Sequence, residues 1–299
     1  MRHCYINGYA LIISVDGFDS VDRDDSKAFF DCLYNGSHVP RDSFDYKKII
    51  SDGNLRRRMG PLVKSGVAAG LLCLDGVPSD SVGGIVTATG LGFLSDTERF
   101  MNDMIDRNES MLNPSPFMQS TFNTVGSHIA MIRGIHSYNM TYVHRGFSFE
   151  SALSDAMMLI DEGAETVLAG GFDEMTFPVH KLLVRLGSAP KFQNGEISGF
   201  VLLSSIRTGN TFAELHCVKT RYGHFSEENL EKWRSDVALS YGTDLESAGI
   251  FDCDSSVSGP YMTDSASVLC NALEKGSGKT FIRNDFCGKN HSLILLDIL

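Results

Sequence analysis

The clearest pattern of apolar and polar positions lies near the middle of the chain. β-Branched and aromatic residues predict a strand at residues 138–143. Apolar residues then recur at helical spacing, which predicts that Ser148–Glu162 is the most buried helix of the protein. Gly163 ends this helix, and an apolar run predicts a second strand at residues 166–169. The pattern therefore predicts a strand, a sharp turn, a long buried helix and another strand.

The patterns on either side predict further alternation of helices and strands. Residues 21–46 are acidic and mixed, which indicates a surface helix and a loop. Residues 55–74 form an amphipathic pattern, in which Gly66 and Gly70 indicate an ordinary close helix crossing rather than a ligand site. The other expected elements are strands at 4–15, 82–89, 199–206, 212–218, Gly249–Cys253, 280–282 and 292–297, helices at 96–104, 177–186, 227–239 and 261–273, and a loop at 113–117. This alternation predicts an α/β fold of layered, mixed and largely parallel sheets.

The composition is that of an ordinary globular protein with a large core. The chain has 299 residues, of which 42% are hydrophobic and 21% charged. A net charge of −11 argues against a nucleic-acid surface. The basic run Arg56-Arg57-Arg58 is either a solvated helix start or a surface for an anionic partner.

The cysteines and the apolar runs indicate in which cellular compartment the protein is expected. Seven dispersed cysteines without a C-x-x-C spacing indicate reduced thiols, not a disulfide framework or a metal site. No signal segment and no apolar run long enough to span a membrane is present. We therefore expect a cytoplasmic protein that is not inserted in a membrane and uses neither a metal nor a cofactor.

The turn before the central helix is the candidate position for chemistry. A residue at such a turn faces a helix N-terminus, where free N–H groups and the helix dipole stabilise an anion. In this chain the position holds Gly146, which has no side chain, between Arg145 and Phe147. Ser148 suits an N-cap, and Glu150 places negative charge in the first helical turn.

Two short segments, residues 151–153 (Ser-Ala-Leu) and residues 169–171 (Ala-Gly-Gly), carry a family likeness. The region resembles the nucleophile segment of β-ketoacyl synthases of the thiolase fold. In that family a T-x-x-x-A-C-x-S turn precedes the same helix, a G-x-A-D corner and an A-G-G strand end. The cysteine position then falls on Gly146. The likeness is good over roughly residues 56–205, and the chain is similar to the short synthase-like proteins of bacterial aryl-polyene, flexirubin and dialkylresorcinol clusters.

The resemblance implies an architecture and a division of the chain. It implies a thiolase-like αβαβα layered fold with a shortened C-terminal half. Residues 1–195 would form a synthase N-terminal-like half and residues 196–299 the shortened half, within one compact unit.

The resemblance also implies that the catalytic positions are empty. In β-ketoacyl synthases a cysteine takes the acyl group, and two histidines assist decarboxylation of the malonyl thioester. The first histidine lies in an H-G-T-x-T loop, which matches residues 252–256 around Asp254. The second lies in a G-H-T-x-G-A segment, which places Pro260 in the histidine position. The family's G-F-G-G-T-N turn is altered at residues 285–290, where Phe286 is kept.

Other side chains near these positions have alternative interpretations. His144 is either a base or a hydrogen-bonded packing residue, and Ser148 is accounted for as an N-cap. Cys253 lies between Asp252 and Asp254, whose negative charge disfavours a thiolate. His291 maps to a structural position at the start of the last strand.

The segment at residues 117–133 is the expected interface and channel wall. In the family the matching helix lies at the dimer interface and helps to line the acyl channel. The resemblance assigns this role to Phe117, Phe122, Asn123, Val125, Ile129 and Ile132, together with His144, Arg145 and Phe147 at the turn.

Three functions remain open at this point. The first is a non-catalytic partner of the chain-length-factor type, which dimerises with an active ketosynthase (or with itself), contacts an acyl carrier protein and shapes the acyl channel. The second is a divergent enzyme, a 3-oxoacyl-carrier-protein synthase or decarboxylase that uses His144 or another histidine. The third is a carrier-binding scaffold without a synthase partner.

Overall fold

The computed structural model describes residues 2–15, 29–40, 43–186, 195–253 and 261–299. Helices and strands alternate along most of this length, as the sequence predicts. In chain order the elements are β1 (Tyr5–Val15), β2 (Phe29–Tyr34), β3 (Ser37–Val39), α1 (Tyr46–Ile49), α2 (Gly53–Arg58), α3 (Pro61–Cys73), β4 (Val82–Ala88), α4 (Leu94–Asp106), α5 (Pro114–Gln119), α6 (Thr124–Arg133), β5 (Tyr138–Tyr142), α7 (Ser148–Glu162), β6 (Thr166–Met175), α8 (Phe177–Arg185), β7 (Gly195–Ser204), β8 (Ala213–Tyr222), α9 (Glu227–Ser240), β9 (Gly249–Cys253), α10 (Asp264–Lys275), β10 (Gly278–Phe286) and β11 (Asn290–Ile298).

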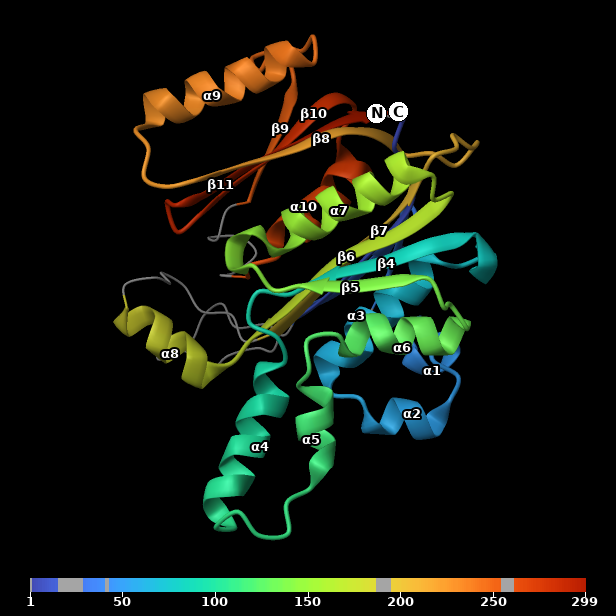
Figure 1. Cartoon of the computed structure of the whole chain (residues 1–299), viewed down its shortest axis with the longest axis vertical. Helices are drawn as coiled ribbons and strands as arrows, with labels where there is room; N and C mark the ends of the chain where they lie inside the picture. Colours follow the sequence, from blue (N-terminus) through green and yellow to red (C-terminus); the bar gives the residue numbers. More distant parts are fainter. Residues whose placement is uncertain (1, 16–28, 41–42, 187–194, 254–260) are drawn as a thin grey trace.

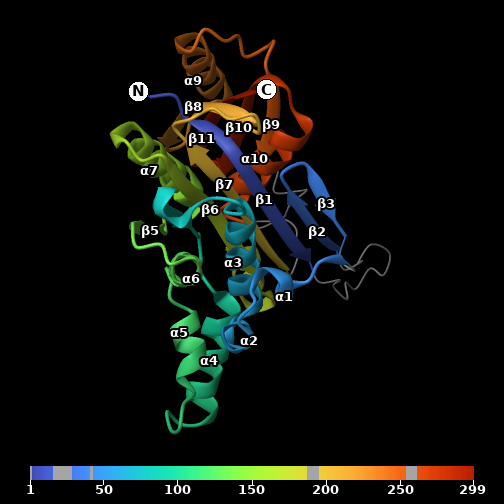
Figure 2. The ribbon, with the colours of Figure 1, turned by 90° about the vertical axis from the view of Figure 1, so that its right-hand side faces the viewer.

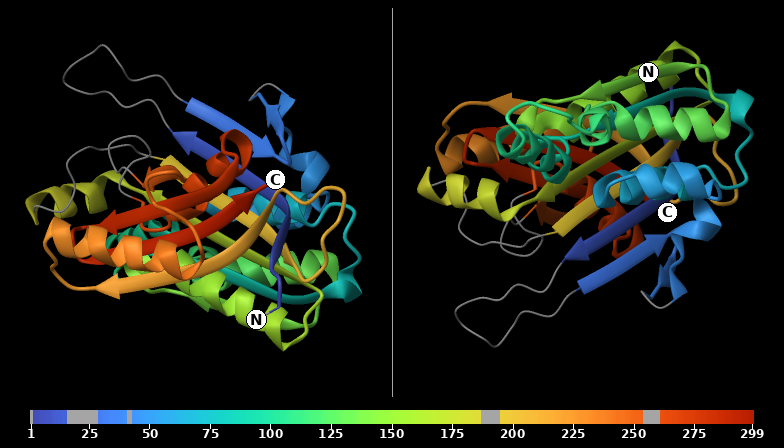
Figure 3. Two further views of the ribbon diagram at one scale, coloured as in Figure 1. Left: turned by 90° about the horizontal axis from the view of Figure 1, so that it is seen from above. Right: turned by 90° about the horizontal axis from the view of Figure 1, so that it is seen from below.

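Helices and sheets form alternating layers in the order α, β, α, β, α (Figure 1). The first sheet has the strand order β5-β4-β6-β7-β1, and the second has β8-β11-β10-β9. They are continuous because Tyr5 and Ile6 of β1 also pair with β8. Helices α7 and α10 lie between the sheets, α3 and α6 cover the outer face of the first, and α9 covers the second (Figures 1 and 3). The predicted αβαβα layering of mixed sheets is therefore confirmed, but the expectation that they are largely parallel is wrong: among the described strand pairs only β4–β5, β4–β6 and β9–β10 are parallel.

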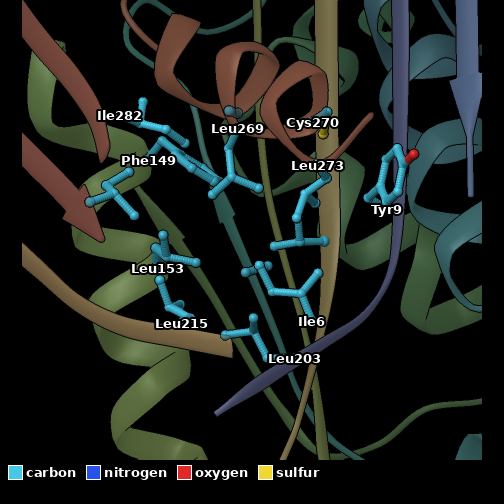
Figure 4. Packing of buried hydrophobic residues seen from close by; sticks show 14 of the residues in the cluster. Ile6, Tyr9, Phe149, Leu153, Leu203, Leu215, Leu269, Cys270, Leu273 and Ile282 are labelled. Atoms are coloured by element: carbon cyan, nitrogen blue, oxygen red, sulfur yellow. The ribbon is translucent and has the colours of Figure 1, made fainter. Parts of the chain in front are cut away.

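The main core lies between the two sheets. It joins apolar side chains of α7 and α10 to side chains of β1, β7, β8 and β10, as Figure 4 shows. Phe149 and Leu153 of α7 meet Leu269 of α10 and Ile282 of β10 in this layer. Two smaller clusters lie under α3 and α6 and under α9. This burial fixes α7, and with it the turn that precedes α7.

The glycines of α3 mark a close helix crossing, as expected. A Cβ placed on Gly66 would lie 2.9 Å from Val125 Cγ2, and one on Gly70 would lie 2.4 Å from Ile129 Cδ1. Both partners belong to α6. The two glycines therefore serve the packing of α6 on α3.

Some expectations about individual elements are wrong. Part of the segment expected to be a surface helix and loop forms the β2–β3 hairpin, in which Cys32 and Leu33 are buried against β1. The expected loop at residues 113–117 contains the start of α5, because Asn113 Oδ1 accepts the Ser115 N–H at 3.0 Å. The most buried helix is α3, with ten of its 13 residues buried against eight of 15 in α7.

Helices α4 and α5 form an arm that projects from the layered body (Figures 1 and 2). No residue of α4 is fully buried. The rings of Phe100 and Phe117, whose centroids are 5.3 Å apart, join the two helices. Among the residues described, no helix is both long and apolar enough to cross a membrane.

Candidate functional site: a filled nucleophile position

A 3₁₀ turn, Arg145–Phe147, connects β5 to α7. Its left-handed residue is Arg145, with φ of 54°, and not Gly146. The N-cap of α7 is Phe147, so the expectation that Ser148 is the cap is wrong. Ser148 Oγ instead donates to the Arg145 carbonyl at 2.7 Å and accepts the His144 N–H at 2.8 Å. These bonds close the turn and occupy the serine hydroxyl.

Phe286 fills the space in front of Gly146. A Cβ placed on Gly146 would lie 2.7 Å from Cδ1, 2.8 Å from Cγ and 2.9 Å from Cβ of Phe286. Asn284, two residues earlier on β10, donates from Nδ2 to the Gly146 carbonyl at 3.4 Å. The structure thus brings together the predicted nucleophile position and the altered glycine-rich turn. A nucleophile side chain at this position would need Phe286 to move.

Glu150 is fully buried beside this turn, which the sequence did not predict. Its Oε1 accepts hydrogen bonds from Asn284 Nδ2 at 3.1 Å and from Ser292 Oγ at 2.7 Å. Oε2 has no hydrogen-bond partner among the described residues. Burial raises the pKa of Glu150 above its usual value, although the bonds from Ser292 and Asn284 oppose that shift. Its place within the apolar positions of the α7 pattern was the available signal.

The hairpin that carries Phe286 is anchored by charged groups. Asp285 accepts a hydrogen bond from the guanidinium of Arg234, which is 2% exposed on α9. The other oxygen of Asp285 lies 2.7 Å from His291 Nδ1, and His291 Nε2 lies 3.1 Å from the Gly223 carbonyl. His291 therefore has the structural position expected from the sequence, and the network fixes the backbone on both sides of Phe286.

A second buried carboxylate, Asp173, joins the two halves of the chain. Its Oδ1 accepts bonds from Thr89 Oγ1 and the Gly90 N–H, each at 2.8 Å. Its Oδ2 accepts bonds from the N–H and the hydroxyl of Thr263 at 2.9 and 2.8 Å. Burial raises the pKa of Asp173, and the bonds from Gly90, Thr263 and Thr89 counteract the rise. With this many donors, Asp173 has a structural role.

Both expected histidine positions, Asp254 and Pro260, lie outside the described residues. The residues around them are described in part. Cys253 has a raised pKa because it is buried and lies near several carboxylates, so the thiolate is disfavoured as the sequence predicted. A Cβ on Gly90 would lie 2.2 Å from Met262 Cβ, which places the segment after Pro260 against the loop after β4.

The residues expected at the interface or channel fall into two groups. Val125 and Ile129 are fully buried under α3, whereas Phe117 and Phe122 are 57% and 45% exposed. The remaining members are distributed between these extremes: Ile132 is half-buried, Phe147 is buried, and Asn123, His144 and Arg145 are exposed.

His144 makes packing contacts at the turn. Its Nδ1 lies 3.2 Å from Ser151 Oγ, and its ring meets the ring of Phe147 edge-on at 6.2 Å between centroids. In the described part of the chain, no cluster of three or more His, Cys, Asp or Glu side chains could hold a metal ion. The described geometry around Gly146 therefore contains packed and hydrogen-bonded groups, and Gly146 itself offers no nucleophile.

Strand β5 lies at the edge of the first sheet and carries exposed apolar residues. It pairs only with β4 among the described strands, which leaves its outer backbone groups unpaired. Tyr138 and Met140 are 39% and 42% exposed. Further exposed apolar side chains lie on α5, α6 and α7, on the segment between α5 and α6, and on the turn after β5. They are Phe117, Met118, Phe122, Met131, Val143 and Met158, and we call them, with Tyr138 and Met140, the β5 surface.

Comparison with solved structures identifies the fold. The ishigamide ketosynthase/chain length factor superposes with a TM-score of 0.73 at 16% identity, over 99% of this chain and 99% of that one. The fold is that of ketosynthases and chain length factors. A β-ketoacyl synthase from Burkholderia phymatum superposes on the same thiolase-like fold with a TM-score of 0.71 at 13% identity, over 100% of both chains.

Another similar structure is a ketosynthase in complex with its chain length factor from Xenorhabdus doucetiae. It gives a TM-score of 0.56 at 14% identity over 99% of each chain. No protein-family model and no curated protein matches the sequence. These likenesses concern the thiolase-like fold.

Proposed function

We propose that the chain is a non-catalytic subunit of the chain-length-factor type, which pairs with an active ketosynthase and acts with an acyl carrier protein. The observation that carries the proposal is Gly146 beneath Phe286. The position that would hold the acyl-accepting cysteine has no side chain, and an aromatic ring occupies the space in front of it. A ketosynthase fold with this turn is suited to binding a partner subunit and shaping the acyl channel rather than to acyl transfer.

The β5 surface supports the presence of a protein partner. An unpaired strand edge flanked by exposed aromatic and methionine side chains is costly for an isolated protein. A second subunit would pair with the open edge and cover these side chains. Methionine side chains adapt to such contacts because they are flexible and polarizable. The ketosynthase is the proposed partner because one of the structures with this fold is a ketosynthase with its chain length factor.

The proposal is tested by co-expression with the ketosynthase encoded nearest to its gene, followed by size-exclusion chromatography and mass analysis. We expect a one-to-one heterodimer. Met140→Lys, which places a charge on the β5 edge, should abolish co-purification. The matched control is Leu239→Lys, because Leu239 is 69% exposed on α9, away from β5. A complex that survives Met140→Lys would contradict the assigned surface. A stable homodimer that excludes the ketosynthase would contradict the proposed function.

A further inference from the structure

A pocket lies toward the opposite end of the strands of the first sheet from Gly146. Leu202 lines this pocket and pairs with Leu168, which lies near the start of β6. Gly146, by contrast, follows the end of β5. Strands β4, β5 and β6 run parallel, so the two places are at opposite ends of these strands. The pocket has a volume of about 490 Å³, which is within the usual range for small-molecule sites.

The polar lining of this pocket is held in place by hydrogen bonds. Asn35 Oδ1 accepts the Tyr9 N–H at 2.8 Å. Asn7 donates to the Ile206 carbonyl at 2.9 Å and accepts the Thr211 hydroxyl at 2.6 Å. These bonds tie β1, the β2–β3 turn and the loop before β8 together. The pocket is therefore built by long-range contacts of three segments and not by a single loop.

The charge of the pocket is negative. Asp75 is the charged residue in its lining, and Tyr34 orients the Asp75 carboxylate by donating to Oδ2 at 3.2 Å. Helix α3 ends at Cys73, which also lines the pocket, and Arg133 caps this end by donating to the carbonyls of Leu74, at 2.8 Å, and Val77. The negative charge of the pocket therefore comes from the exposed carboxylate of Asp75.

Apolar side chains form the rest of the wall. Val77, Leu202 and Phe212 line the pocket beside the asparagines and Asp75. A ligand that fits this arrangement carries a positive charge at one end and a short hydrocarbon part at the other. We propose that this pocket binds a small organic ammonium ion, with the ammonium group at Asp75 and the hydrocarbon part against Val77, Leu202 and Phe212. The site is independent of the proposed ketosynthase partnership.

The test compares three probes of nearly equal size: n-butylammonium, 1-butanol and butyrate. Their binding to the full-length chain is measured by NMR chemical-shift titration at constant ionic strength. We expect saturable shifts at residues around Asp75 and Asn35 with butylammonium, and about two- to fivefold weaker binding of butanol, since one exposed ion pair contributes modestly. Butyrate should not shift these residues.

Asp75→Asn keeps the shape of the side chain and removes its charge, so it should weaken butylammonium binding to the level of butanol. Asp80→Asn is the matched control, because Asp80 is an exposed carboxylate outside the pocket lining. Equal binding of all three probes, an equal effect of the two substitutions, or no saturable shift in the folded wild-type chain would each overturn the proposal.

Discussion

The side chain of Phe286 occupies the space that a side chain on Gly146 would fill, although the two residues lie far apart in the sequence. The missing side chain of Gly146 is replaced by the ring of Phe286, at 2.7 Å from where a Cβ would be. Phe286 is in turn fixed by the bonds of Asp285 to Arg234 and His291. The turn before α7 is therefore closed by packing.

Gly146→Cys tests this closure. We expect the substitution to destabilise the protein by about 1–3 kcal/mol, because overpacking forces Phe286 to move. The introduced thiol should alkylate slowly. Adding Phe286→Ala should restore stability in part and expose a thiol at the N-terminus of α7, where the dipole favours the thiolate. Urea unfolding and mass-spectrometric alkylation rates measure both effects. Rapid labelling of the single Gly146→Cys variant would show that Phe286 does not close the turn.

The wild-type chain should form no acyl adduct. Incubation with a labelled acyl thioester is expected to leave its mass unchanged, because Gly146 has no nucleophile and the hydroxyl of Ser148 is bonded to the Arg145 carbonyl. Intact-mass spectrometry reads the result, with an active ketosynthase as positive control. A stable adduct, above all on Ser148 or Cys253, would favour the alternative of a divergent acyl-thioester enzyme.

If the chain acts with an acyl carrier protein as proposed, the basic surface of α1 and α2 should contact that carrier protein. Arg57 and Arg58 are exposed, and both helices have basic last turns although the chain carries a net charge of −11. Charge reversal by Arg57→Glu and Arg58→Glu should weaken carrier binding to the heterodimer several-fold and reduce its salt dependence. The double variant Lys219→Glu and Lys232→Glu makes the same charge change elsewhere. If both double variants weaken binding equally, the effect is one of net charge and the assignment to α2 is wrong.

Glu150 should make stability depend on pH. A carboxyl whose pKa is raised on folding stabilises the native state fully below its unfolded pKa, and this contribution is lost as pH rises through the folded pKa. Glu150→Gln has no such group, so the stability of wild type relative to this variant should fall as pH rises above 4.5, the ordinary value. Urea unfolding at several pH values measures the difference. Glu162→Gln, at the exposed end of α7, should show no comparable trend. A difference that grows in the opposite direction would mean that the hydrogen bonds from Ser292 and Asn284 outweigh burial and lower the pKa of Glu150.

Asp173 should be among the most sensitive positions for stability. Asp173→Ala leaves the N–H groups of Gly90 and Thr263 and two hydroxyls without their acceptor, so we expect a loss of about 3 kcal/mol or more. Denaturant unfolding with a matched exposed change, Asp161→Ala, measures it. A loss below 1 kcal/mol, on the order of that for a surface residue, would mean that other groups hold the β4 and α10 segments together.

Local patterns predicted the elements whose burial follows from sequence spacing alone. The helix Ser148–Glu162 and the strand Gly249–Cys253 have the bounds expected from the sequence. Gly66 and Gly70 lie at the close crossing of α3 and α6, as their spacing in the sequence predicted. The family likeness placed Gly146 at the turn before α7. These features depend on periodicity, glycine positions and short motifs, which the sequence displays directly.

Features that depend on distant partners could not be predicted in this way. Glu150 lies among the apolar positions of the α7 pattern, but the sequence does not show that Asn284 and Ser292 of the second sheet are the partners that make its burial possible. The β2–β3 hairpin forms because β1 has an open edge there. The pairing of Phe286 with Gly146 is likewise a contact between the two halves, and the division of the chain at residue 195 stays a prediction.

The position of β1 has a consequence for the order in which the protein is made. Tyr5 and Ile6 pair with β8, and the whole of β1 pairs with β7. Strand β1 is synthesised well before β7 and β8 and therefore waits for these partners. Contacts of such long sequence separation slow folding and leave apolar strands exposed in the nascent chain. We infer that chaperones, and early arrival of a partner subunit, would matter more for the yield of this protein than the strength of any single contact.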